Sequence, residues 1–70
     1  MENGAWNGPM GIERGKITSV TADGYIVESL DRPGLITPPI ISIFNTPYIA
    51  NDAVYFFLFP DGTGRVLFKI

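Results

Sequence analysis

The side chains that most often carry out catalysis are missing from this sequence. Its 70 residues include no histidine, the commonest general base, and no cysteine, the commonest thiol nucleophile and soft metal ligand. Catalysis would therefore depend on the seven carboxylates, on lysine, on tyrosine or on hydroxyl groups. The carboxylates are scattered singly along the chain, whereas an oxygen-ligated Ca²⁺ or Mg²⁺ site needs a cluster of them. We expect no enzyme, no metal site and no cofactor.

Three of these carboxylates stand beside turn glycines. Asp23, Asp31 and Asp61 each lie within three residues of a glycine, where an aspartate commonly accepts hydrogen bonds from the backbone of the turn. Residues 61–64 read Asp-Gly-Thr-Gly, which differs in order from the Asp-Thr-Gly motif of catalytic aspartates. No predicted helix follows these glycines, as a phosphate-binding loop would require. We interpret the three aspartates as structural turn residues.

The aromatic residues indicate more about function than the carboxylates do. Tyr55, Phe57 and Phe59 alternate along one stretch and therefore share one face of a strand, while the intervening residues are apolar as well. A small domain has one core, so the second apolar face indicates an interface with another protein or a second layer of core. Stacking of nucleic-acid bases and binding of a small ligand are the alternatives for this stripe. Trp6, in an otherwise polar stretch, either covers an open end of the domain or anchors a partner.

The composition favours a protein partner over nucleic acid or a membrane. Hydrophobic residues make up 46% of the chain and charged residues only 17%, which is low for a small soluble monomer. The net charge of -2 lacks the basic footprint that attracts phosphate backbones, so nucleic acid is disfavoured. No apolar run approaches the ~20 residues that span a bilayer, and the N-terminus has no signal-peptide pattern. We expect a chain that folds in a cytoplasm, does not enter a membrane and binds a second copy of itself or a neighbouring protein.

A hairpin is predicted over residues 15–30. β-Branched residues favour strands on either side of a turn at Asp23 and Gly24, where Gly24 supplies the positive φ that a tight hairpin needs. Ile17 and Val20 lie three positions apart, so in a regular strand their side chains would point to opposite faces. A bulge or strong coiling near Thr18 and Ser19 would turn both side chains to the core.

Turns and a proline-rich connection occupy the middle of the chain. Pro33 and Gly34 stand at the second and third positions of a predicted type II turn. Residues 35–44 are apolar, but their paired prolines cannot donate backbone hydrogen bonds. The first half of this segment is therefore expected at a sheet edge or in an extended connection. Residues 48–52 predict a short loop or single turn.

The strongest structural pattern is the hairpin of residues 53–70. A dense turn cluster at residues 60–64 separates its two strands. In the second strand Val66, Phe68 and Ile70 share a face that we expect to be buried, while the other face is largely solvated.

These elements predict an all-β chain. No stretch has the apolar spacing of an amphipathic helix, and prolines and glycines interrupt most long windows. Residues 12–70 predict a single domain of five short strands, either a small barrel, OB-like or SH3-like, or a strongly coiled sheet. Residues 1–11, rich in glycine and asparagine, predict a flexible N-terminal arm. The predicted structural turn positions are Asp23, Gly24, Pro33, Gly34, Asn51, Asp52, Asp61 and Gly62.

Four stretches of the sequence form a recognisable pattern of strands and turns: residues 15–20, 25–27, 51–59 and 61–70. Together they resemble the small OB-type barrels of contractile-tailed phage baseplates and tail-spike hubs. In that family a Gly-x-Val opening strand and a late Gly-Asp-x-Val hairpin recur. Asn51 stands here where the glycine is usual, which asparagine allows because it tolerates the left-handed region. The resemblance implies a structural role for a bacterial or phage-encoded protein, with copies packed around an axis or on neighbouring tail proteins, in the cytoplasm or in the virion.

We therefore predict a non-catalytic structural or assembly module that packs through apolar strand faces into a homo-oligomer or a larger particle such as a phage tail or baseplate. The candidate interface residues are Trp6, Tyr55, Phe57 and Phe59. The alternative is an OB- or SH3-like binding module for single-stranded nucleic acid that uses the stripe of Tyr55, Phe57 and Phe59.

Overall fold

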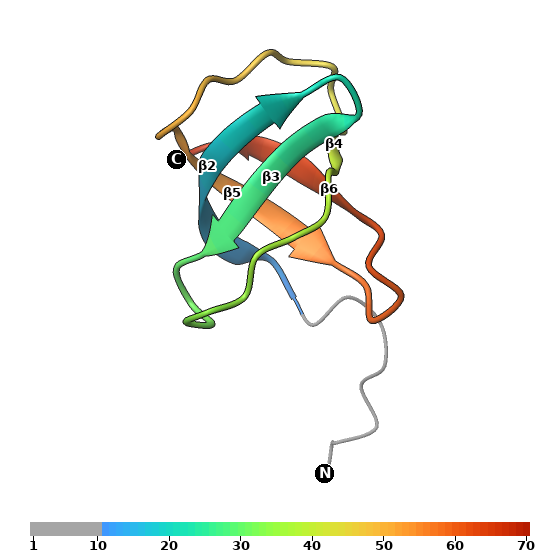
Figure 1. Ribbon diagram of the computed structural model, residues 1–70. Helices are drawn as coiled ribbons and strands as arrows, with labels where there is room; N and C mark the ends of the chain where they lie inside the picture. Colours follow the sequence, from blue (N-terminus) through green and yellow to red (C-terminus); the bar gives the residue numbers. More distant parts are fainter. Residues whose placement is uncertain (1–10) are drawn as a thin grey trace, which may run out of the picture.

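The computed structural model describes residues 11–70. This part of the chain contains five β-strands, which form one sheet (Figure 1). No helix occurs in this range. The prediction of an all-β domain with five short strands is confirmed. Trp6, a candidate interface residue, lies outside the described residues. The strands are β2 (Glu13–Thr21), β3 (Gly24–Ser29), β4 (Ile41–Ser42), β5 (Ala53–Leu58) and β6 (Gly64–Lys69).

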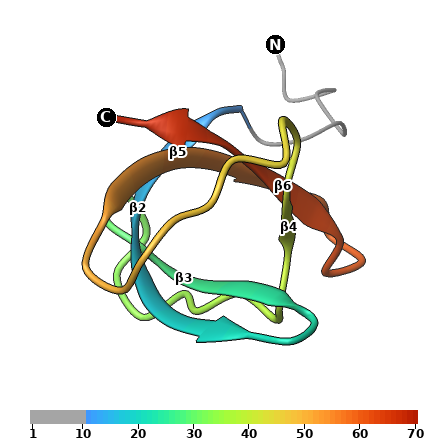
Figure 2. The same cartoon turned by 90° about the horizontal axis from the view of Figure 1, so that it is seen from above.

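The long strand β2 joins the two halves of the sheet, whose strand order is β3-β2-β5-β6-β4. The first residues of β2 pair antiparallel with β5, and most of its length pairs antiparallel with β3. β5 and β6 form the predicted last hairpin, and β4 adds to β6 in parallel. Seen from above, the strands and their connections curl around the centre of the molecule (Figure 2).

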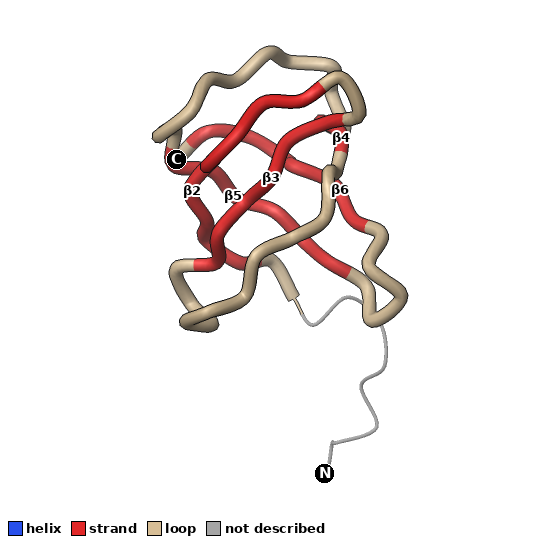
Figure 3. The backbone as a smooth tube through the Cα atoms, in the orientation of Figure 1, coloured by secondary structure: helices blue, strands red, loops and turns tan. Residues whose placement is uncertain are grey.

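The sheet stays open between β3 and β4, so of the two predicted architectures, a small barrel or a strongly coiled sheet, the closed barrel does not form. Two isolated bridges, Tyr25 with Ile40 and Glu28 with Ile36, link β3 to the connection that precedes β4. The two prolines of this connection lie between the bridges and have no N–H to donate, which prevents a continuous ladder. Figure 3 shows the connection as irregular chain. The extended course expected for the paired prolines is confirmed.

The core is formed by side chains on the inner face of the curled sheet. Phe56 of β5 is the largest of the fully buried side chains. A Cβ at Gly15 would collide with Val27 and lie 2.8 Å from Phe56, so only glycine fits under these side chains in β2. The buried apolar residues are Ile17, Val27, Ile40, Tyr48, Val54, Phe56, Leu58 and Val66.

The bulge predicted in β2 is present. The pairing with β3 shifts between Ile17 and Ser19, which leaves Thr18 as the extra residue. Beyond the bulge, Val20 lies opposite Tyr25 and faces the same side of the sheet as that ring. Val20 is nevertheless 54% exposed, because the end of the hairpin extends beyond the buried core. The expectation that the bulge brings Val20 into the core is wrong.

A second bulge lies in β6, where the sequence pattern predicts regular alternation. Tyr55 pairs with Phe68, but the following residue of β5 pairs with Val66, which leaves Leu67 as the extra residue. The bulge reverses the facing of the side chains that follow it. Val66 is fully buried, whereas Phe68 is 51% exposed. The prediction that Phe68 and Ile70 are buried on the same face as Val66 is therefore wrong.

Candidate interaction surface

The predicted aromatic stripe lies on the outer face of β5 and continues into the turn that follows it. Tyr55 and Phe57 are half-buried and alternate with residues whose side chains belong to the core. Phe59 comes directly after β5, and its ring meets that of Phe57 edge-on, with the centroids 5.4 Å apart. The prediction that this strand is apolar on both faces is confirmed.

The bulge in β6 adds a fourth ring to this surface. Phe68 packs edge-on against Tyr55, with the ring centroids 5.3 Å apart and an interplanar angle of 61°. We call Tyr55, Phe57, Phe59 and Phe68 the aromatic face. Sequence alternation assigns Phe68 to the interior, and no local sequence signal marks the bulge that turns it outward. The pairing register alone identifies it as a member of this surface.

Two arginines border the aromatic face. Arg14 of β2 lies opposite Tyr55, and Arg65 of β6 lies opposite Phe57. The Arg14 guanidinium donates hydrogen bonds of 2.6 and 3.1 Å to the Asp31 carboxylate. These bonds raise the pKa of Arg14 and, with a further bond from the Arg14 backbone N–H, hold the pKa of Asp31 below its ordinary value. Arg65 takes part in none of the ion pairs within residues 11–70.

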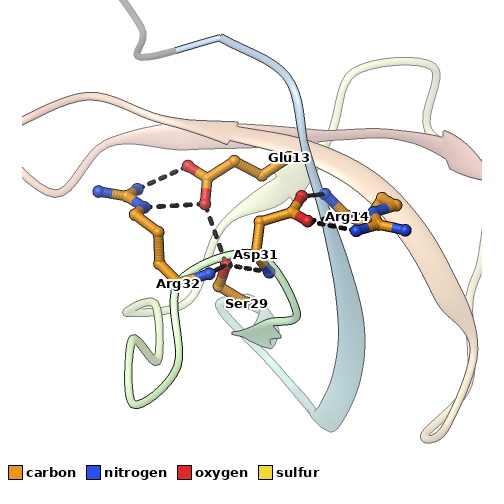
Figure 4. Close-up of polar contacts among 5 residues, drawn as sticks. All are labelled: Glu13, Arg14, Ser29, Asp31 and Arg32. Atoms are coloured by element: carbon orange, nitrogen blue, oxygen red, sulfur yellow. Dashed lines mark hydrogen bonds and ion pairs between the residues drawn. The ribbon is translucent and has the colours of Figure 1, made fainter.

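A polar cluster of Glu13, Ser29 and Arg32 connects the turn after β3 to the start of β2 through hydrogen bonds (Figure 4). Glu13, only 6% exposed, accepts bonds of 2.9 and 2.6 Å from the Arg32 guanidinium and one of 3.0 Å from the Ser29 hydroxyl. The hydrogen bonds to Glu13 raise the pKa of Arg32. A hydroxyl beside a carboxylate can act as a nucleophile, but the Ser29 oxygen is buried and already accepts the backbone N–H groups of Asp31 and Arg32. We therefore assign the cluster a structural role, which the sequence pattern did not reveal.

The predicted turn residues lie at four connections of the sheet. Asp61 accepts hydrogen bonds from the hydroxyl of Thr63 at 2.7 Å and from its backbone N–H at 2.9 Å, which lower the pKa of Asp61. The backbone N–H of Ile49 likewise lowers the pKa of Asp52, with a smaller effect from Lys69. The residues lie at the β2–β3 turn (Asp23, and Gly24 as the first residue of β3), after β3 (Pro33, Gly34), before β5 (Asn51, Asp52) and between β5 and β6 (Asp61, Gly62).

Backbone geometry explains two of these positions. Gly34 has a φ of 86°, and the Leu35 N–H donates to the Arg32 carbonyl at 3.1 Å, as in a type II turn. Asn51 has a φ of 76°, in the left-handed region that asparagine tolerates. Asp23 differs from the other turn aspartates, because its carboxylate accepts no hydrogen bond from residues 11–70.

We found no protein-family model, curated protein or solved structure that matches this chain. Within the described residues, no helix is long and apolar enough to cross a membrane. The same residues bring no three metal-ligating side chains of His, Cys, Asp or Glu together.

Proposed function

We propose that the protein is a non-catalytic structural module that assembles with other protein subunits through the aromatic face. One observation carries this proposal. Three aromatic rings lie on the outer face of β5 and β6 and a fourth, Phe59, follows directly after β5, whereas the solvent-facing side of an antiparallel sheet usually carries polar residues. Aromatic side chains and arginine are enriched at protein–protein interfaces, and both occur together on this surface.

An OB-like fold fits the topology of the module. β2 pairs with both β3 and β5, as the first strand of an OB fold pairs with the second and the fourth. β4 runs parallel to β6, as the third OB strand does to the last. OB folds are partly open five-stranded barrels, and the gap between β3 and β4 is compatible with that architecture.

We further propose that the module belongs to a larger particle such as a phage tail or baseplate. The resemblance of the strand pattern to OB-type baseplate barrels supports this setting. A structural role is supported by the absence of histidine and cysteine from the sequence and by its low content of charged residues, 17%. The expected partners are copies of the chain or neighbouring subunits of such a particle.

Size-exclusion chromatography with light scattering tests the assembly proposal. We expect oligomers of the wild-type chain whose mass rises with concentration. Phe68→Ser should lower that mass, because it removes an exposed ring without touching the core. Leu30→Ser is the matched control, since Leu30 is equally exposed, at 52%, but lies outside the aromatic face. A folded wild-type monomer at every concentration up to about 1 mM would overturn assembly of copies of the chain through the aromatic face.

One observation favours a second candidate function, the binding of single-stranded nucleic acid. Arg65 beside Phe57 combines a cation with a stacking surface, as in proteins that bind unpaired bases. The net charge of -2 and the engagement of Arg14 by Asp31 weigh against it. OB folds also bind oligonucleotides on their second and third strands, whereas these rings lie on the last two. Fluorescence anisotropy with a labelled single-stranded oligonucleotide tests this second function. Binding at low salt that weakens steeply as the salt concentration rises would support it, and the absence of binding at low salt would exclude it.

A further inference from the structure

A groove of about 260 Å³ lies between the turn after β3 and the β5–β6 turn. Figure 1 shows both turns at the same end of the molecule. A cavity of roughly 150 Å³ already accommodates a benzene ring, so this groove has room for one bicyclic aromatic side chain. Four apolar side chains, one arginine and one glycine line the groove: Leu35, Leu58, Phe59, Pro60, Arg32 and Gly62.

The described part of the chain begins beside this groove. Glu13, the first residue of β2, binds the guanidinium of Arg32 at 2.6 Å, and Arg32 lines the groove. Glu13 also pairs with Phe56 of β5. Because β2 and β5 are antiparallel, the chain that precedes Glu13 lies toward Leu58, another residue of the lining. Residues 1–10 therefore join the domain at the end that carries the groove.

The segment of residues 1–10 contains the one tryptophan of the sequence, Trp6. Trp6 precedes Gly11, the first described residue, by five positions, and five extended residues span about 17 Å. Trp6 can therefore reach the groove without any change in the described residues. An indole is large and mostly apolar and has a single N–H to satisfy, so burial of its ring in an apolar groove is favourable.

The lining of the groove fits an indole in chemistry as well as in size. Leu35 and Leu58 offer apolar contacts, and the ring of Phe59 offers an edge or a face. The Arg32 guanidinium donates to Glu13 through Nε and one terminal nitrogen, in the plane of the group. An aromatic ring can stack on the face of a guanidinium that is engaged in this way, and tryptophan is the side chain that cations attract most strongly.

We propose that Trp6 occupies this groove in its own chain, with the indole in contact with Leu58 and Phe59 and with the guanidinium of Arg32. The short connection decides between this occupant and a second copy. It gives an effective concentration on the order of 1 mM, so at micromolar protein concentrations the chain's own indole fills the groove first. The inference does not depend on the assembly function, because only Phe59 of the aromatic face lines the groove.

Fluorescence of the single tryptophan tests this contact. At micromolar concentration we expect the wild type to emit at shorter wavelength, and to be quenched less by acrylamide, than the chain unfolded in urea. Phe59→Ser removes one wall of the groove and should move both values to those of the unfolded chain. Phe68→Ser is the matched control, because it removes a ring of the aromatic face that does not line the groove, and it should leave both values unchanged. Circular dichroism confirms that each variant folds.

Nuclear Overhauser effects in the wild type give a second readout that needs no variant. We expect contacts between the indole protons of Trp6 and the methyl groups of Leu35 and Leu58. The inference is overturned if the wild type emits like the unfolded chain, if the two serine variants have the same effect, or if the indole contacts other methyl groups instead.

Dilution separates this inference from the assembly of copies. Emission that moves to longer wavelength on dilution, while the mass measured by light scattering falls, would assign the groove to Trp6 of a second copy and would overturn docking within the chain. A monomeric wild type whose indole contacts Leu58 would support the docking of Trp6 and overturn only the assembly of copies. An oligomeric wild type with a solvated indole would do the reverse.

Discussion

Glu13 is the residue whose substitution tests the packing of this small domain most directly. In Glu13→Gln the side chain keeps its shape but loses its charge, and its amide N–H groups face the Arg32 guanidinium, which has only donors. Breaking a buried ion pair costs about 3–5 kcal/mol. The Arg32 side chain is 45% exposed, so water can hydrate its guanidinium once the ion pair is broken. We therefore expect the substitution to lower the free energy of unfolding by less than that range, about 2 kcal/mol. In a domain of this size that loss lowers the melting temperature by about 8–16 °C.

Thermal and urea unfolding followed by circular dichroism measure this effect. Glu28→Gln makes the same chemical change on the outer face of β3 and should alter stability by less than about 0.5 kcal/mol. A double-mutant cycle with Arg32→Gln isolates the pair and should give a coupling energy above about 0.5 kcal/mol. The reasoning fails if Glu13→Gln melts within about 2 °C of the wild type, or if the cycle shows the two substitutions to be additive.

Four further predictions concern two glycines, a core ring and the pH dependence of stability. Gly15→Ala should destabilise the fold by about 1–3 kcal/mol in urea titrations, because its Cβ would collide with Val27. Gly34→Ala, which meets open space and is strained only by its φ of 86°, should cost about 1 kcal/mol. Phe56→Ala should cost roughly 3–5 kcal/mol and leave no folded domain in far-ultraviolet circular dichroism at 37 °C. Stability should also fall as the pH drops below the ordinary aspartate pKa of 3.8, since groups with a lowered folded-state pKa stabilise the fold only while ionised. Urea titrations from about pH 6 to pH 2 check this, and the aspartates concerned are Asp31, Asp52 and Asp61.

Local signals explain why the strands and turns were predictable. The turn at Gly24 and the pairing of Pro33 with Gly34 depend on backbone conformations that few residues adopt, so residue type alone reveals them. The bulge in β2 was predictable as well, because Ile17 and Val20 cannot both face inward without one. Closure of the barrel could not be predicted from local signals, because it depends on whether two segments distant in sequence form a continuous ladder.

Only the part of the aromatic face that lies on β5 could be predicted from the sequence. Tyr55 and Phe57 alternate within one strand, so their shared face follows from strand geometry alone. The place of Phe68 depends on its pairing with Tyr55 across the bulge, and the sequence of β6 taken alone assigns it to the core. Burial of Glu13 is equally non-local, because its partner Arg32 comes from the turn after β3. Pairings between elements, and not the propensity of any one of them, determine these features.

The open gap beside β3 and the bulge in β6 have the same energetic consequence. The prolines before β4 interrupt the ladder that would close the sheet, and the bulge places Phe68 outside the core. Both features keep apolar area on the surface, where it contributes to stability only when another molecule covers it. A chain this small buries only ~60% of the surface that it exposes when unfolded, so an isolated monomer would gain stability from an additional ring in its core. In the proposed assembly a second subunit covers the aromatic face, so the stability of the domain would be coupled to the binding of that subunit.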